Sequence, residues 1–482
     1  MKKCLRYSVL VLGIIFAILG ICLKSYSFAL LCTVACFLNN IIYCSENIKN
    51  RIFLLMFHIM ILVFLLGRPI IELCRKHDWW KEYVNEFSKE SLFFAINALT
   101  ISLIAMFAAA LLAERHKKEK VRNVVIDRNT VYIEKFRNNL QIISAVIFYF
   151  SMIAFLMLEV EKLIFMSGRD YVEYYSSFVS HAPYIIHLIA GFMKYSLCIF
   201  LGTFPEKKKC YLPLALYLIS AVPGLIIGIR NPIMLNAVFI FLYFFIRDAL
   251  NDKDKWLGKL EKMAIGIGTP AALLFMGAYS SIRVGNSNIP DGIGKLFVSF
   301  FYGQGVSFKV LNIGYSCMDI LPNRMGKNYT FGGFIDYVTH GAIAQKFFSA
   351  EALDSGNSVK NAMLSNNLSH SLAYVSKGDE YITGHGWGSS YLLETFIDFG
   401  YWGIAVYSFL LAYILIKGMK IIKKNSLTAT IFLFILTQIF FVPRAEATGF
   451  LDFTIQIGFW LAIVLCYLLA GLCCKKYEFV KT

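Results

Sequence analysis

The sequence is poor in charged residues. Of its 482 residues only 16% are charged and 58% are apolar, whereas soluble domains carry about 25% charged residues. It has only 10 prolines against 43 phenylalanines and 27 tyrosines, which excludes disordered and low-complexity chains, because those lack aromatic residues and favour proline. The composition excludes a water-soluble enzyme and predicts an all-α polytopic membrane protein.

Motifs of several large enzyme classes are also missing. The sequence has no glycine-rich phosphate loop ending in Lys-Ser/Thr, no Cys-x-x-Cys pair, no His-Glu-x-x-His and no Gly-x-Ser-x-Gly. ATP hydrolysis, structural zinc, zinc proteolysis and serine hydrolysis therefore have no support. Asp252 and Asp254 have the spacing of a metal-binding pair, but interleaved lysines would neutralise them. We expect no metal and no cofactor.

Long apolar runs take up most of the chain. The first resembles a signal peptide, but no small-residue cleavage site follows, so we expect it to stay as an anchor. The seventh and eighth runs are interrupted by prolines and glycines and could instead form a re-entrant hairpin. Twelve runs approach the roughly 20 residues that a helix needs to cross a bilayer, at about 7–23, 27–44, 52–71, 92–112, 140–158, 184–204, 211–229, 232–246, 263–282, 400–416, 426–443 and 454–473.

The distribution of positive charge predicts a topology with both termini in the cytoplasm. The chain has 47 Lys and Arg against 31 Asp and Glu, a net charge of +16. In a soluble protein this excess would suggest nucleic acid, but in a membrane protein it reflects basic loops facing the cytoplasm and anionic lipid. Lysines and arginines are dense in the tails and the predicted inside loops, above all in 114–139. We therefore expect contact with membrane lipid and no nucleic-acid partner.

This topology divides the chain into three parts. We expect membrane helices 1 to 9 in residues 1–282, a large external loop in 283–399 and helices 10 to 12 in 400–482. The loop mixes apolar stretches with polar turns, which favours short amphipathic helices lying over the membrane face. The 12 cysteines give no disulfide framework, because most lie in apolar spans or beside cytoplasmic lysines. Only Cys74 and Cys317 fall in predicted outside loops and could form one bridge.

Four arginines lie near the outer ends of predicted spans, where the positive-inside rule disfavours them. Each could simply extend to lipid headgroups, but four at one depth favour a shared pocket. A guanidinium stays charged and binds phosphate oxygens bidentately, so the pocket is predicted to bind a phosphate-containing ligand. The four are Arg230, Arg283, Arg444 and, as the weakest candidate, Arg68.

A second group of polar residues lies at the end of the large loop. If the segment from Ser389 is helical, Tyr391, Glu394 and Asp398 lie on one face. Acidic residues at a helix N-terminus can also be purely structural. Histidines could transfer protons because imidazoles titrate near neutrality, although loop histidines are most often merely exposed. The histidines of the loop are His340, His370 and His385.

These features resemble the Wzy family of bacterial oligosaccharide repeat-unit polymerases, which make O-antigen or capsule. The resemblance rests on about twelve spans with both ends inside, on the Gly-Ile-Arg-Asn-Pro turn at 228–232 and on the late external loop. It also rests on the exit of the loop at 386–394, followed by Asp-Phe-Gly-Tyr-Trp-Gly at 398–403. Related ligases and shape-determining glycosyltransferases share this layout.

The resemblance implies a fold like that of integral-membrane (GT-C-like) glycosyltransferases in a bacterial cytoplasmic membrane, with catalysis at the outer face. It implies transfer of a growing glycan from undecaprenyl diphosphate onto the next lipid-linked repeat unit, without nucleotide or metal. A chain-length regulator could be a further partner. On this interpretation the arginines neutralise the departing diphosphate.

The same interpretation needs a base for the accepting hydroxyl. Glu394 is the first candidate, because its apolar neighbours would desolvate it and make it more basic, and His370 is the second. The residues expected to contact the glycan or support these two are Asp398, His385, Trp387, Tyr391 and Glu446. Other outer-face aromatic residues could stack on sugars or form an interfacial belt, namely Trp79, Trp80, Trp402, Tyr171, Tyr174 and Tyr175.

Two alternatives stay open. A flippase that carries the same lipid-linked unit would need a charged cavity within the bundle, whereas the last five predicted spans are nearly devoid of charge. An O-antigen-type ligase, which moves finished glycan to another acceptor, is excluded by no residue of the sequence.

Overall fold

The structure, a computed structural model, describes residues 2–75, 87–115, 129–169, 173–174, 177–250, 255–283 and 292–479. Over these residues the chain is helical and has no strand. Twelve of the described helices are long and apolar enough to cross a membrane. The predicted all-α polytopic membrane protein is therefore confirmed, and the number of candidate spans equals the number predicted.

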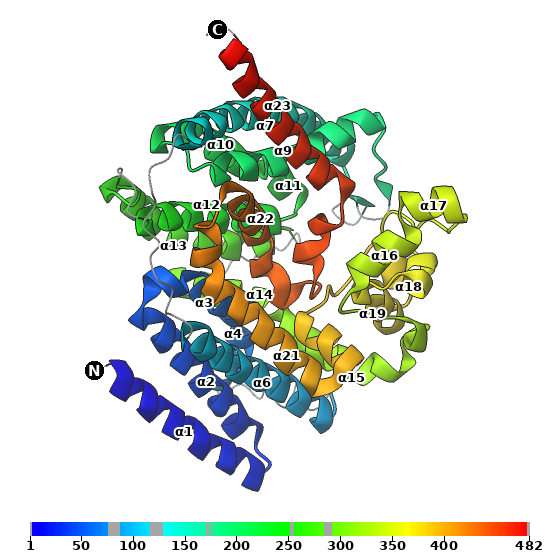
Figure 1. Cartoon of the computed structure of the whole chain (residues 1–482). Coiled ribbons are helices and arrows are strands. Elements are labelled where there is room, and N and C mark those ends of the chain that lie inside the picture. The colour runs from blue at the N-terminus through cyan, green and yellow to red at the C-terminus, as the bar shows by residue number, and fades with distance from the viewer. Residues whose placement is uncertain are drawn as a thin grey trace. The chain divides into compact units, whose positions relative to one another are not determined.

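The helices, which are labelled in Figure 1, form two compact units. The first comprises Met1–Arg115, Leu260–Lys417 and Ile439–Phe450, and the second comprises His116–Lys259, Gly418–Gln438 and Leu451–Thr482. The predicted parts 1–282, 283–399 and 400–482 are divided by membrane topology, whereas the two units are divided by the contacts between helices. The predicted division stays a prediction.

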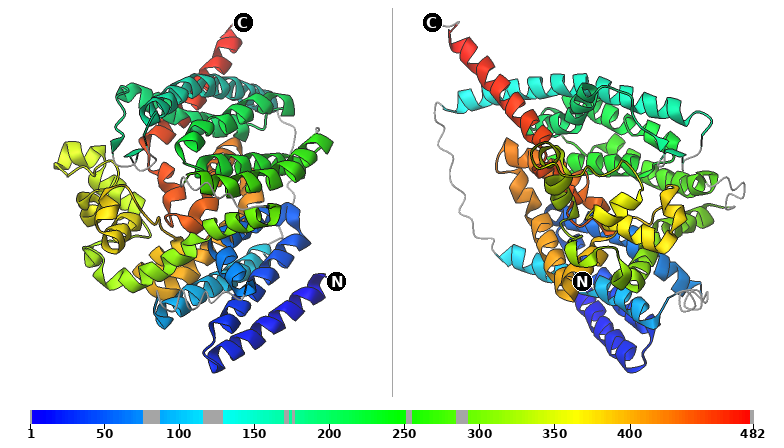
Figure 2. Two further views of the ribbon diagram at one scale, coloured as in Figure 1. Left: turned by 180° about the vertical axis from the view of Figure 1, so that it is seen from behind. Right: turned by 90° about the vertical axis from the view of Figure 1, so that its right-hand side faces the viewer.

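The first unit contains most of the helices. They are α1 (Lys2–Cys22), α2 (Tyr26–Glu46), α3 (Ile48–Ile61), the π-helix η1 (Leu62–Leu66), α4 (Gly67–Cys74), α6 (Lys89–Arg115), α13 (Lys259–Arg283), α14 (Ile293–Gln304), α15 (Val306–Cys317), η2 (Met318–Ile320), η3 (Arg324–Gly326), α16 (Gly332–His340), α17 (Ala342–Phe348), α18 (Val359–Leu364), α19 (Leu368–Lys377), α20 (Asp379–Ile382), most of α21 (Tyr391–Ile422) and η4 (Ile439–Arg444). In this unit α2 packs against α1, α3 and α6, and α14 packs against α4. Figure 2 shows α1 and α2 side by side.

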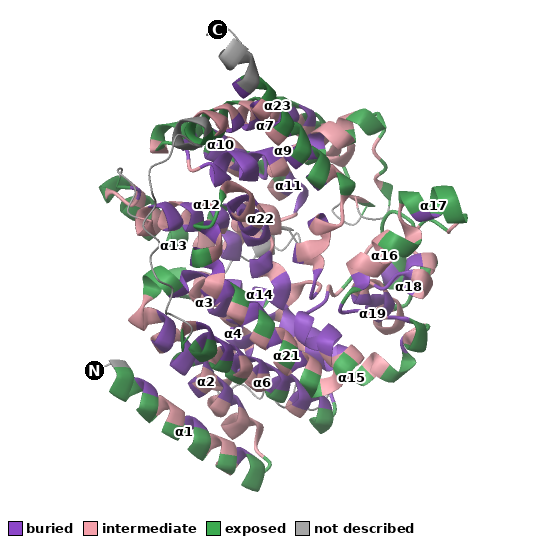
Figure 3. Cartoon of the chain, in the orientation of Figure 1, coloured by how far each residue is buried: buried purple, intermediate pink, exposed green. Residues whose placement is uncertain are grey.

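The outward face of α1 is apolar. Val11, Ile14 and Ile18 are exposed, and Figure 3 shows exposed and half-buried residues along the whole helix. Exposed apolar side chains are expected where a helix faces lipid, because hydrocarbon is as apolar as they are. The face therefore needs no protein partner.

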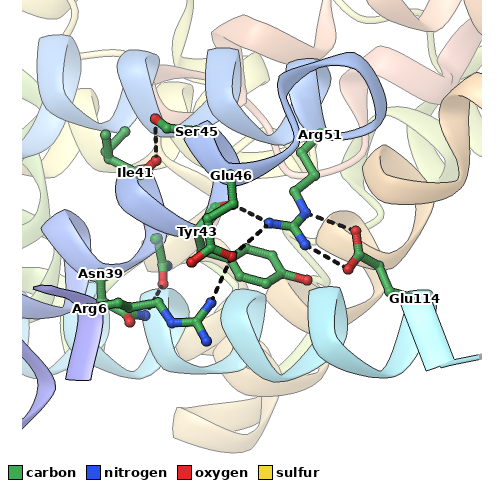
Figure 4. Close-up of polar contacts among 9 residues, drawn as sticks. Arg6, Asn39, Ile41, Tyr43, Ser45, Glu46, Arg51 and Glu114 are labelled. Carbon is green, nitrogen blue, oxygen red and sulfur yellow. Dashed lines mark hydrogen bonds and ion pairs between the residues drawn. The ribbon is translucent and has the colours of Figure 1, made fainter. Parts of the chain in front are cut away.

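Two arginines and two glutamates on α1, α2, α3 and α6 form ion pairs with one another (Figure 4). Arg51 donates Nε to Glu114 Oε1 at 2.8 Å and Nη2 to Glu114 Oε2 at 2.7 Å. Arg6 and Arg51 each contact Glu46, at 3.2 and 3.5 Å. The Arg51 guanidinium also lies over the Tyr43 ring, 3.6 Å from its centroid. An unpaired charge is costly in a membrane protein, so these ion pairs stabilise the packing of four helix ends. The predicted topology puts these ends on the cytoplasmic side.

The second unit is built around α7, the longest helix. Its helices are α7 (Asn129–Met166), α9 (Tyr184–Gly202), α10 (Lys207–Ile219), α11 (Val222–Ile227), α12 (Asn231–Ala249), α22 (Ser426–Leu436) and α23 (Ile457–Phe479). α7 packs along α9, and α23 packs against both. The 3₁₀ segment η5 (Gly449–Thr454) joins residues of the two units in sequence.

The interrupted seventh and eighth runs form a broken helix and a whole one. α10 and α11 are separated at Ser220 and Ala221, and Gly228 then turns the chain with φ +105°. A positive φ favours glycine, which has no Cβ. Lys207–Ile227 and Asn231–Ala249 are each long and apolar enough to cross a membrane.

The predicted external loop contains short helices, α14 to α20, as its sequence predicts. Their position over the membrane face stays a prediction. At the end of the loop, α21 is kinked at Gly400, which has φ +63° and ψ −157°. The helical turns before the kink carry the acidic residues of the candidate site. Cys74 and Cys317 are both free thiols, so the structure does not contain the bridge that they could form.

Candidate active site

Residues 444–448 of the first unit form the centre of the candidate site, and we call them the 444–448 segment. Its backbone is held by buried partners: the Ala447 amide donates to Glu394 Oε2 at 2.7 Å, the Tyr407 hydroxyl donates to the Ala447 carbonyl, and Thr448 Oγ1 donates to the Thr330 carbonyl at 2.7 Å. Ala447 and Thr448 are buried. Arg444 and Glu446 are half-buried. The segment therefore presents one positive and one negative side chain from a fixed backbone.

Two of the four predicted arginines meet the C-terminal end of α14. Arg68, on α4, donates Nη2 to the Tyr302 hydroxyl at 3.1 Å, and its guanidinium lies 4.3 Å from the centroid of that ring. Arg444 donates Nη1 to the Gln304 carbonyl at 3.3 Å and to Gln304 Oε1 at 3.1 Å. A Cβ at Gly305 would lie 2.4 Å from Arg68 Cβ, so glycine permits the approach. Two arginines thus contact the C-terminal end of α14. The helix dipole is negative at this end and favours cations there.

Glu394 lies in the first turn of α21 and is 0% exposed. Its Oε1 accepts a hydrogen bond from Ser389 Oγ at 2.6 Å, and its Oε2 accepts one from the Ala447 amide at 2.7 Å. The side chain is buried, as the apolar sequence around it predicts. Its role as a base stays a prediction, and the contacts favour a carboxylate that positions the 444–448 segment.

Glu446 lies beside the N-terminal end of α19. Its Oε1 accepts a 2.5 Å hydrogen bond from Asn367 Nδ2. Asn367 is the N-cap of α19, and its side-chain oxygen accepts from the Ser369 amide at 2.9 Å. The positive end of a helix dipole favours a carboxylate at this place. The contact connects the 444–448 segment to the helix that carries His370.

His370 lies in the first turn of α19 and is half-buried. Its Nδ1 is 2.8 Å from the Tyr381 hydroxyl, which donates to the Ser358 carbonyl at 3.0 Å. The single proton of that hydroxyl is donated to Ser358, so the hydroxyl accepts a hydrogen bond from Nδ1 of His370. Nδ1 therefore carries the proton of the neutral ring, and Nε2 carries the lone pair. Burial lowers the pKa of His370, with an opposing effect of Asp336 and a reinforcing effect of Lys327. The ring is therefore neutral near pH 7 and can accept a proton at Nε2.

Asp398 fixes the loop before α16. Its Oδ2 accepts hydrogen bonds from the Thr330 amide at 2.6 Å and the Thr330 hydroxyl at 2.7 Å. Arg324 Nη2 is 3.8 Å from Asp398 Oδ1. Because Thr330 in turn binds Thr448, Asp398 supports the same segment that Glu394 supports from the previous helical turn.

The other predicted residues of this region differ in their surroundings. Tyr391 is fully buried and its hydroxyl is 2.7 Å from Ser102 Oγ, so it faces the helix bundle. Trp387 is half-buried, with the Lys377 amine 4.4 Å from its ring centroid. His385 is exposed.

The two remaining arginines are not brought to the end of α14 by any described contact. Arg230 belongs to the second unit, where it is the half-buried N-cap of α12. Arg283 is the last residue of α13, and its side chain lies outside the described residues. Other residues singled out in the sequence also lie outside the described residues, namely Trp79, Trp80, Tyr171, Tyr175, Asp252 and Asp254.

Sequence reasoning missed several polar residues of the site. Tyr302, Gln304 and Asn367 bind the predicted charged residues, but no spacing or motif marks them. Lys327 is 8% exposed and donates to the Ala362 carbonyl at 2.7 Å. Burial lowers its pKa to about 8, against an opposing effect of Asp336. Each of these contacts forms only when the chain is folded. Among the described residues, no group of three or more His, Cys, Asp or Glu could hold a metal ion.

Twelve candidate spans among the described helices, with arginines and buried carboxylates around the 444–448 segment, define a multi-pass membrane protein with a polar site. A family model described as O-antigen polysaccharide polymerase Wzy matches residues 5–477. The match covers nearly the whole chain, so the chain belongs to the O-antigen polysaccharide polymerase Wzy family, and the resemblance seen in the sequence is confirmed. A search of curated proteins and a search of solved structures found no match. Family membership makes the protein a glycosyltransferase-type enzyme that acts on lipid-linked oligosaccharide repeat units in the membrane.

Proposed function

We propose that the protein polymerises undecaprenyl-diphosphate-linked repeat units at the outer face of a bacterial cytoplasmic membrane, by glycosyl transfer without a metal. The observation that carries the proposal is the meeting of Arg68 and Arg444 at the end of α14. Both lie at ends of spans that the predicted topology puts outside. Guanidinium groups bind the oxygens of a diphosphate in bidentate fashion and supply the positive charge that a metal would otherwise give.

The proposed reaction is a single displacement. The acceptor hydroxyl attacks C1 of the donor sugar, the bond from C1 to the diphosphate breaks, and the diphosphate leaves with the electron pair. Arg68 and Arg444 stabilise the charge that develops there. Arg230 and Arg283 are proposed to assist as further diphosphate ligands, on the strength of their predicted depth.

The proton of the acceptor hydroxyl needs a base. Glu394 and His370 are the two proposed candidates, and the contacts favour His370. Its pKa is lowered by burial, and no described residue forms a hydrogen bond with Nε2. Both oxygens of Glu394 accept hydrogen bonds from buried groups. Glu446, Trp387 and His385 are proposed to contact the glycan. Glu446 and Trp387 are half-buried and bind Asn367 and Ser376 of the α19 region, and His385 is exposed.

The test is the surface glycan of a deletion strain. Loss of a polymerase leaves single repeats on the surface. Long lipid-linked chains without surface glycan would instead show a ligase, and accumulation of the unit in the cytoplasm would show a flippase. Either result would contradict the proposal.

A further inference from the structure

Glu72 is a buried carboxylate that the proposed reaction does not use. It lies on α4 and is 3% exposed. Its Oε1 has no hydrogen bond, and within the described part of the chain the residue takes part in no ion pair. An ionised carboxylate taken out of water costs several kcal/mol unless it is paired. A carboxylate kept in such a place is expected to have a partner that arrives from outside the protein.

The place of Glu72 in the fold suggests what that partner is. It follows Arg68 by four residues, so both side chains lie on one face of α4, one turn apart. α4 packs against α14, whose Tyr302 binds the Arg68 guanidinium. Arg68 does not neutralise Glu72, because no ion pair joins them among the described contacts. The helix thus presents a cation and an unpaired carboxylate side by side.

We propose that Glu72 binds the hydroxyl groups of the sugar that is joined to the diphosphate. The inference rests on the proposed function, in which Arg68 binds that diphosphate. One helical turn rises about 5.4 Å, which is similar to the distance from a phosphate to the ring that it substitutes. A carboxylate accepts hydrogen bonds from sugar hydroxyls but repels phosphate, so the two side chains divide the ligand between them. A divalent cation is a poorer partner, because it needs several oxygen ligands.

The first measurement is thermal unfolding of the purified, ligand-free protein. Glu72→Gln replaces a buried carboxyl group that has no ion-pair partner among the described residues by an amide of the same shape, so it should not lower Tm. Glu134→Gln is the matched control, because Glu134 is an exposed glutamate on α7; its Tm should stay at the wild-type value. A lower Tm for Glu72→Gln would show that Glu72 has a structural partner, which contradicts the inference.

The second measurement separates the sugar from the diphosphate by two probes. One is undecaprenyl diphosphate, and the other is the lipid-linked repeat unit extracted from the deletion strain. Both should raise the Tm of the wild type, and the repeat unit should raise it more. Glu72→Gln should keep the shift with undecaprenyl diphosphate and lose the additional shift with the repeat unit. Arg68→Lys should lose both. An unchanged additional shift in Glu72→Gln would overturn the inference.

The third measurement is the rate of polymerisation. Glu72→Gln should raise KM for the repeat unit roughly 10- to 100-fold, as loss of a charged hydrogen bond does, with kcat unchanged. A fall in kcat alone would overturn the inference, because it would make Glu72 a base and not a sugar ligand. If the wild type binds both probes but forms no polymer, the proposed function fails while the sugar-dependent Tm shift still decides the role of Glu72.

Discussion

Glu394 Oε2 accepts a 2.7 Å hydrogen bond from the backbone amide of Ala447, which lies three residues after Arg444. The contact joins the start of α21 to the 444–448 segment, and both groups are buried, where polar groups are almost always hydrogen-bonded. It therefore fixes where Arg444 and Glu446 point. A residue in this position can be essential without exchanging a proton.

Substitution of Glu394 separates positioning from proton transfer. In Glu394→Gln, the amide oxygen can still accept from Ala447 and the amide nitrogen can donate to the Ser389 hydroxyl, which also accepts. We expect this variant to make full-length polymer within several-fold of the wild-type rate. Glu394→Ala should lose both hydrogen bonds, destabilise the protein by about 2–5 kcal/mol and make single repeats. Chain length on gels and thermal unfolding measure both effects.

The control for Glu394 is Glu380, an exposed glutamate 2.8 Å from the Lys377 amine. Glu380→Gln and Glu380→Ala should leave stability and chain length unchanged, because exposed ion pairs contribute little. Single repeats from Glu394→Gln at the wild-type Tm would restore Glu394 as the base.

Arginine-to-lysine variants test the diphosphate site. Arg68→Lys and Arg444→Lys keep the charge but lose the bidentate fork, so each should reduce the rate of polymerisation by roughly 10²-fold. Arg230→Lys and Arg283→Lys should also lose most activity if all four arginines form one pocket. Polymerisation in vitro, at matched protein levels, gives the rates.

Arg75→Lys is the matched control for the arginines, because Arg75 is exposed at the end of the same helix as Arg68. It should polymerise normally. If the variants of Arg68 and Arg444 polymerise at the wild-type rate, the diphosphate does not bind at the end of α14.

Most of the spans could be predicted from the sequence because each of these is a continuous apolar run of nearly membrane length. The break between α10 and α11 was also visible, since glycine and proline mark it. The division into two units could not be predicted. It depends on how helices distant in the sequence pack, as when α22 packs against α9 and α15 against α6, and no local pattern encodes such pairs.

The candidate site could be predicted in part. Arg68 and Arg444 could be found because basic residues at outer ends of spans violate the positive-inside rule. The burial of Glu394 could be predicted from its apolar neighbours in the sequence. The end of α14 that meets both arginines carries no such signal, because Tyr302 and Gln304 are ordinary polar residues. Glu72 is equally inconspicuous in the sequence, since only its burial without a partner distinguishes it.

Cysteine labelling tests the predicted topology. In a cysteine-less background, Ser355→Cys and Met325→Cys should react with an impermeant maleimide in intact cells, because both positions are exposed and lie in the predicted external loop. Asn328→Cys should react more slowly, since Asn328 is half-buried. Lys424→Cys, in an exposed turn predicted to be cytoplasmic, should react only after lysis. The reverse pattern would invert the topology and move the candidate site to the cytoplasmic face.

The pH dependence of polymerisation tests His370. Burial lowers its pKa below the ordinary value of 6.5, so the neutral ring that can accept a proton predominates above that pH. The rate should be constant near neutrality and fall with acidification, with a midpoint below about 6.5. His370→Gln should reduce the rate by about 10² to 10⁴ and abolish this acidic limb. His181→Gln, which changes an exposed histidine that has no proposed role in the reaction, should keep both the rate and the limb. Full-length polymer from His370→Gln with the acidic limb intact would exclude His370 as the base, because the group that titrates would then lie elsewhere.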